Sequence, residues 1–191
     1  MTDFWFYLKI GVTHILDIDG LDHFYFIISF CLLYSFKDWK KIVGLVTAFT
    51  VGHCITLFIS GLELITINTD TVELLIPITI LLSCLNNFYT LTKGKQTAQH
   101  IGFTYCILLA FGLIHGLGFS NYAKMMTFDN DSILITLLGF NIGIELAQLV
   151  IVTGILTISA GLEFILKSKI NWFRFAVNSI ITLLVLKLMI F

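Results

Sequence analysis

Long apolar segments, joined by short polar connections, limit this chain more than any other feature of its sequence. Residues 42–62, 72–91, 101–119 and 132–166 are each nearly free of charge and are long enough, or almost long enough, to cross a bilayer core of about 30 Å. Hydrophobic residues make up 58% of the chain and charged residues only 12%, with a mean hydropathy of +0.97. Soluble domains carry roughly twice that share of charge. We therefore predict an all-α integral membrane bundle of six or seven transmembrane helices, forming a single transmembrane domain over residues 1–191.

The charges of the connections alternate along the chain. Connections 37–41, 93–100 and 167–174 contain most of the lysines and arginines, whereas 63–71 and 120–131 contain only Lys124. The positive-inside rule places the first set in the cytoplasm and the second outside, so the C-terminus is expected outside. No basic run suggests a nucleic-acid partner.

Residues 11–26, GVTHILDIDGLDHFYF, contain His14, Asp17, Asp19, Asp22 and His23 between apolar flanks. An ionisable group within a membrane span costs at least a few kcal/mol, so such groups usually have a function. Imidazole and carboxylate together are typical ligands of a divalent transition metal. Asp17 and Asp19 also suit the N-cap of a helix that starts near residue 20. We interpret His14, Asp22 and His23 as candidate metal ligands, with Asp19 as a supporting residue.

Two further histidines lie at a similar depth on the outer side of the predicted bundle. His53 is past the midpoint of an outward-going span, and His115 is near the outer end of another. A single membrane histidine often serves only to hydrogen-bond neighbouring helices. Four histidines at one depth favour a shared site, so His53 and His115 join the predicted metal ligands. Gly112 and Gly116 flank the second motif with a spacing typical of close helix packing.

The segment FNIGIELAQ places Asn141, Glu145 and Gln148 on one helical stripe. A buried carboxylate requires a cation, or else it takes up a proton. We therefore expect Glu145 to be a metal ligand, a hydrogen-bond partner of a ligating histidine, or a proton carrier. A protonated structural glutamate is the alternative. Asn141 and Gln148 are expected to support the ligands by hydrogen bonds.

Taken in order, these segments resemble the HupE/UreJ family of small membrane proteins, in particular its shorter branch. The matching motifs are GVTHILDIDGLDHFYF, FTVGHCITL, VELLIP, FGLIHGLGF and FNIGIELAQL, which together span residues 11–149. The resemblance implies a nickel or cobalt permease in a bacterial inner membrane, with Asp22, His23 and His115 carried over as site residues. Seven residues separate His14 from Asp22 here, where the better-studied branch has five, which predicts a different helix face for His14.

Three functions fit these observations. The first is uptake of a nickel- or cobalt-class ion, bound by neutral imidazoles and one or two carboxylates near the outer face. The second is a membrane-embedded zinc-type hydrolase of a lipid-like substrate, in which the metal activates a water molecule. The third is a metal or polar cluster that only holds the bundle together. The expected partners are the lipid bilayer and the metal ion, and such a bundle is compatible with a homo-oligomer. A polar path through the inner half, where Ser83, Asn86, Asn87 and Asn178 lie, would favour the permease.

Overall fold

The computed structural model describes residues 2–17, 21–65, 68–93, 101–119 and 133–190, and their regular structure is helical throughout. The α-helices are α1 (Thr2–Leu16), α2 (Leu21–Cys31), α3 (Trp39–Gly61), α4 (Thr69–Lys93), α5 (Ile101–Gly118), α7 (Ile133–Leu166) and α8 (Ile170–Ile190). Two 3₁₀ turns, η1 (Phe36–Asp38) and η2 (Lys167–Lys169), precede α3 and α8. The all-α prediction is confirmed for the described part of the chain.

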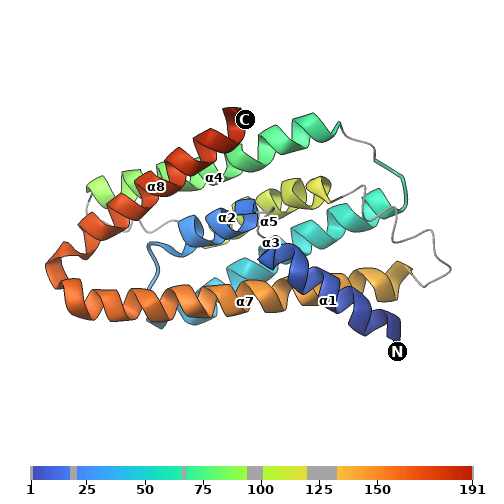
Figure 1. Cartoon of the computed structure of the whole chain (residues 1–191), viewed down its shortest axis with the longest axis horizontal. Helices are drawn as coiled ribbons and strands as arrows, with labels where there is room; N and C mark the ends of the chain where they lie inside the picture. The colour runs from blue at the N-terminus through green and yellow to red at the C-terminus, as the bar shows by residue number, and fades with distance from the viewer. Residues whose placement is uncertain (1, 18–20, 66–67, 94–100, 120–132, 191) are drawn as a thin grey trace.

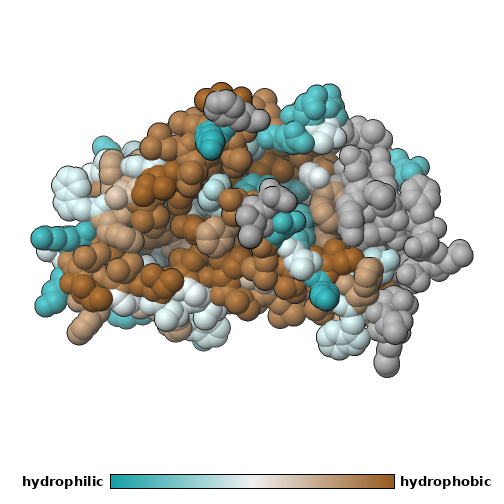
Figure 2. Space-filling model, in the orientation of Figure 1, coloured by the Kyte–Doolittle hydropathy of each residue, from teal (hydrophilic) through white to brown (hydrophobic). Residues whose placement is uncertain are grey.

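Three helical stretches are long and apolar enough to cross a membrane, namely Phe36–Gly61, Thr69–Lys93 and Leu134–Ile190. The last stretch contains both α7 and α8; α8 runs beside α4, whereas α7 lies on the other side of the bundle and packs on α1 (Figure 1). The face seen in Figure 2 is mostly hydrophobic along its middle, and hydrophilic residues gather at its left end. This distribution is the one expected of a bundle surrounded by lipid.

The first two helices follow one another in the same general direction (Figure 1). Helix α1 has 15 residues and α2 has 11, so α2 is only about 16 Å long and cannot cross a bilayer core by itself. Helix α1 ends at Leu16 and α2 begins at Leu21, so the chain reaches His14 and His23 on two separate short helices. Asp19 and Gly20, at the break, lie outside the described residues.

Glycines bring two pairs of helices into close contact. On α5, Gly112 and Gly116 lie against the backbone oxygens of Phe49 and His53 on α3, and a methyl group on either glycine would overlap its neighbour. On α7, Gly143 lies in the same way against the backbone of Leu8 on α1. The predicted packing role of these glycines is confirmed, and its consequence is that two histidine-bearing helices, α3 and α5, are held close together.

The basic helix ends lie at one end of the bundle. The end of α4, the start of α3 and the turn between α7 and α8 are found together, opposite the end of α3 and the starts of α4 and α7 (Figure 1). Ring and hydrogen-bond contacts agree, since Asn87 pairs with Asn178 and Phe88 with Phe175 in antiparallel order. Connections 94–100 and 120–132 lie outside the described residues.

Candidate metal centre

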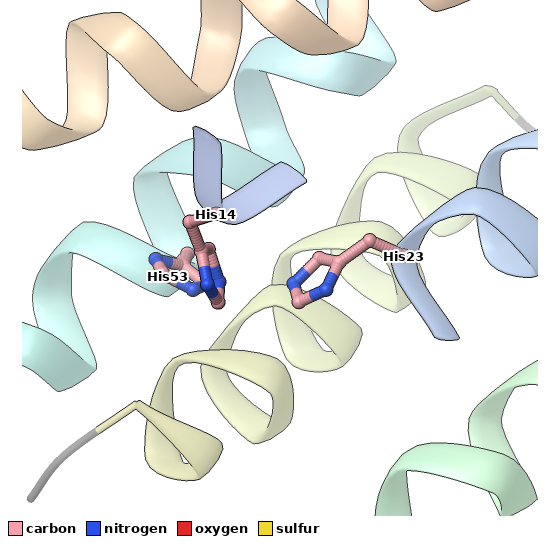
Figure 3. Close-up of side chains that lie close together, drawn as sticks. All are labelled: His14, His23 and His53. Atoms are coloured by element: carbon pink, nitrogen blue, oxygen red, sulfur yellow. The ribbon is translucent and has the colours of Figure 1, made fainter. Parts of the chain in front are cut away.

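Three histidines from three different helices point toward one another. His14 lies near the end of α1, His23 in the first turn of α2, and His53 in the second half of α3 (Figure 3). Each offers one ring nitrogen, and these three atoms all lie within 4.8 Å of one another. Nitrogens that share a tetrahedral metal at bonds of 2.0–2.1 Å stand about 3.4 Å apart. Small rotations of the side chains would therefore close the three rings around an ion.

His115, on α5, extends this group to four imidazoles. Its ring centre lies 5.3 Å from that of His23, while His14 and His23 are 4.8 Å apart. The side chains of His23, His53 and His115 are all buried, with at most 4% of their surface exposed. Among the described residues, the buried Nε2 atoms of all four histidines have no hydrogen-bond partner.

Hydrogen bonds fix two of the four rings with a free nitrogen toward the group. The Nδ1 of His23 lies 3.1 Å from the Asp22 carboxylate, and the Nδ1 of His115 lies 2.9 Å from the backbone oxygen of Phe111. Both oxygens can only accept, so in each ring Nδ1 carries the proton and Nε2 keeps its lone pair. A metal-ligating histidine typically has this arrangement, in which a carboxylate or carbonyl orients the ring.

Phenylalanine rings enclose the histidines. Phe119 stacks on Phe140 with ring centres 4.8 Å apart, and Phe119 also lies 4.2 Å from His14. On the other side, Phe26 and Phe49 lie 5.2 and 5.0 Å from His115. Sequence reasoning did not identify this shell. A signal was present, because each histidine from His23 onward in these motifs has a phenylalanine three or four positions away, on the same helix face.

The structure assigns different surroundings to the predicted carboxylates. Asp22, expected as a ligand, is bonded to His23 and lies outside the group of three converging nitrogens. Glu145, also expected as a ligand, accepts a hydrogen bond of 2.6 Å from Thr47 on α3. Neither Glu145 nor its partner belongs to the histidine group. The structure therefore does not bring Glu145 to the histidines.

The residues predicted to support the ligands by hydrogen bonds do not all contact the histidines. The amide nitrogen of Asn141 donates to the Leu137 backbone oxygen within α7, and its buried Oδ1 has no hydrogen-bond partner among the described residues. Gln148 accepts a hydrogen bond from Thr50, which joins α7 to α3 about one helical turn before His53. Asp19 lies outside the described residues. His14 was expected on a different face, but the break after α1 brings its ring to His23.

Neutral imidazole nitrogens in an apolar surrounding are chemically suited to a divalent transition metal. Imidazole binds zinc, copper, iron and nickel, whereas magnesium and calcium prefer oxygen ligands. The donor set of the described residues, with three or four imidazoles and one carboxylate that orients a ring, therefore fits the predicted class of ion.

The fold and this site together define an integral membrane protein of apolar helices with a buried histidine group. The chain belongs to the HupE/UreJ family, because the family model described as HupE / UreJ protein matches residues 1–191. No curated protein and no solved structure matched the chain. The resemblance of the five motifs to this family is thereby confirmed over the whole chain.

Proposed function

We propose that this protein carries a divalent transition-metal ion of the nickel or cobalt class across the membrane. The ion would bind to the Nε2 atoms of His23 and His115 and to ring nitrogens of His14 and His53, with Asp22 orienting His23. The observation that carries the proposal is the convergence of four histidines whose buried Nε2 atoms have no partner among the described residues. Membership of a family associated with nickel and cobalt transport supports the choice of ion.

The unpaired nitrogens argue against a cluster that only holds helices together. Leaving a buried polar group without a partner costs about 1–3 kcal/mol, so four such groups cost a large part of a typical net stability of 5–15 kcal/mol. Elsewhere in the bundle, by contrast, the buried amides of Asn87 and Asn178 are hydrogen-bonded to each other. A bound cation would satisfy the histidines at once, because each lone pair becomes a metal bond.

The zinc-type hydrolase is the second candidate, because three histidines leave a fourth position of a tetrahedral metal open for water or His115. Such an enzyme needs a pocket in which a substrate reaches the metal. The cavity described below, which is formed by described residues, includes none of the histidines in its lining. This arrangement favours transport, in which the ion itself moves.

We base the proposed orientation of the protein in the membrane on the charges at the two ends of the bundle. Seven of the basic residues, Lys37, Lys40, Lys41, Lys93, Lys167, Lys169 and Arg174, belong to the helix ends gathered at one end of the bundle. We propose that this end faces the cytoplasm of a bacterial inner membrane, with the C-terminus outside and six passes if α1 and α2 count as one. The histidine group then lies nearer the outer surface, where it would receive the incoming ion.

The proposal is tested first by measuring the metal bound to the purified protein and then by measuring uptake into liposomes. Purified protein is incubated with Ni²⁺, Co²⁺ or Zn²⁺, passed over a desalting column and analysed for bound metal, and liposomes containing the protein are assayed for uptake. We expect about one ion per chain, uptake of the retained ion, and weaker retention with slower uptake in His53→Ala. His100→Ala, which removes the one histidine outside the described residues, is the matched control. Wild-type protein that retains no ion would refute the proposal, whereas retention without uptake would favour the enzyme or a structural metal.

A further inference from the structure

A cavity of about 580 Å³ opens among α2, α4 and α5 on the side of the histidines that faces the basic end. Its lining begins with Tyr34 and Lys41, next to η1 and the start of α3, and ends with Phe26 and Phe111 deeper in the bundle. The cavity therefore extends from the basic end of the bundle toward the histidine group.

One wall of the cavity is polar. Ser83, Asn86, Asn87 and Thr90 line it from α4, at positions i, i+3, i+4 and i+7, which form one stripe along the helix. This stripe rises about 10 Å at 1.5 Å per residue. The opposite walls, from α2 and α5, are apolar apart from Thr104. Polar side chains in a membrane span usually face a water-filled cavity or a neighbouring helix, and here Asn87 does both.

Aromatic rings separate the cavity from the histidines. Phe26 is only 3% exposed, and its ring lies 5.2 Å from His115, 4.9 Å from Phe49 and 6.0 Å from Phe111. Phe26 and Phe111 are members of the cavity lining, while His115 is not. A single layer of rings therefore stands between the deepest part of the cavity and the nearest histidine.

We infer that this cavity is the exit vestibule for the hydrated metal ion, and that Phe26 is the barrier which must move to connect it with the histidine group. The inference rests on the proposed transport function. The α4 stripe supplies oxygens that can replace part of the hydration shell of the ion as it leaves. The apolar ring of Phe26 offers no ligand and keeps the two compartments apart in this conformation.

The lysine at the mouth of the cavity fits an exit more than a second binding site. The Nζ of Lys41 lies 4.9 Å from the centre of the Tyr34 ring, so its charge is held at the rim. A fixed positive charge repels a divalent cation and shortens its stay in the vestibule. Because the vestibule binds the ion more weakly than the imidazoles do, an ion that has left the histidines is released quickly.

The test compares two ways of adding a phenylalanine to α4. In Ser83→Phe the new ring would enter the cavity just below Phe26, whereas in Leu85→Phe it would replace a side chain that is 60% exposed and is not part of the lining. Retention of Ni²⁺ by the purified protein and initial rates of Ni²⁺ uptake into liposomes are measured for both. We expect Ser83→Phe to retain Ni²⁺ within twofold of wild type while its uptake falls at least tenfold, and Leu85→Phe to match wild type in both assays. Phe26→Ala, which removes the barrier, should speed uptake at least threefold.

The outcomes separate this inference from the proposal on which it rests. Uptake at the wild-type rate in Ser83→Phe, with retention intact, would overturn the vestibule and leave metal transport standing. If Ser83→Phe loses retention, the rate of Phe26→Ala decides, and an unchanged rate overturns the inference. A wild-type protein that neither retains nor takes up Ni²⁺ would overturn both ideas together.

Discussion

Replacing Asp22 by asparagine removes one charge beside the proposed metal while leaving most of the local geometry in place. The Oδ1 of Asp22 lies 3.1 Å from the Nδ1 of His23 and also accepts a 2.9 Å hydrogen bond from the His23 backbone N–H. The asparagine oxygen can accept both bonds. The variant therefore tests the carboxylate charge, which makes the imidazole a stronger ligand and partly neutralises the cation.

The expected loss is moderate because Asp22 acts through His23. Removing a residue that orients a ligating histidine typically weakens metal affinity 10- to 100-fold, which corresponds to about 1.4–2.7 kcal/mol. The side chain of Asp22 is 24% exposed, so water screens part of its charge. We therefore expect a loss near tenfold for Asp22→Asn and near a hundredfold for Asp22→Leu, which also removes the hydrogen-bond acceptor.

Competition with a chelating dye measures the affinity of the purified protein for Ni²⁺ in both variants. Asp70→Asn is the matched control, because Asp70 is an exposed carboxylate in the first turn of α4 just as Asp22 lies in the first turn of α2. The control accounts for loss of a favourable charge at a helix N-terminus. Equal affinity in Asp22→Asn and wild type would show that the contact with His23 does not tune a metal ligand.

Three other perturbations give distinct results. Retention of Ni²⁺ should be complete at neutral pH and be lost in strong acid, because protons and metal compete for the imidazoles; Ni²⁺ that stays bound at a pH of about 2 would contradict histidine ligation. Gly112→Ala should lower the free energy of unfolding by about 1–3 kcal/mol, because the new methyl group meets the Phe49 backbone, whereas Gly154→Ala, which meets nothing within 4 Å, should not; equal thermal stabilities would contradict the packing. Glu145→Gln should retain Ni²⁺ within twofold of wild type, because glutamine can still accept the hydrogen bond from Thr47; a loss of tenfold or more would return Glu145 to the metal site.

The length and apolarity of the segments were sufficient to predict the helices. A backbone in lipid must satisfy its own hydrogen bonds, so an apolar run such as residues 42–62 has few choices other than a helix. The same argument gives each polar residue a depth, because each helical position advances about 1.5 Å. The depths estimated in this way are similar for His23, His53 and His115, and in the structure the rings of His53 and His115 both lie close to that of His23.

Depth alone does not tell which neighbouring helix a side chain contacts, and Glu145 and His14 illustrate this point. Glu145 shares one stripe of α7 with Asn141, yet its carboxylate accepts a hydrogen bond from Thr47 on α3 and lies outside the histidine group. The direction of His14 depends on the break between α1 and α2. A helical projection drawn through the break rotates His14 to the wrong face, whereas the two separate helices place its ring 4.8 Å from that of His23.

X-ray absorption spectroscopy of the full-length protein loaded with Ni²⁺ tests the central claim most directly, because it reports the atoms bound to the metal. The structure predicts at least three imidazole nitrogens at about 2.0–2.1 Å, a distance taken from zinc–histidine bonds, with the outer-shell scattering typical of histidine rings. The signal should lose one imidazole in His14→Ala, in His23→Ala and in His53→Ala, and none in His100→Ala. A first coordination sphere of oxygens alone, or a spectrum that the three substitutions leave unchanged, would contradict binding of the metal by this histidine group.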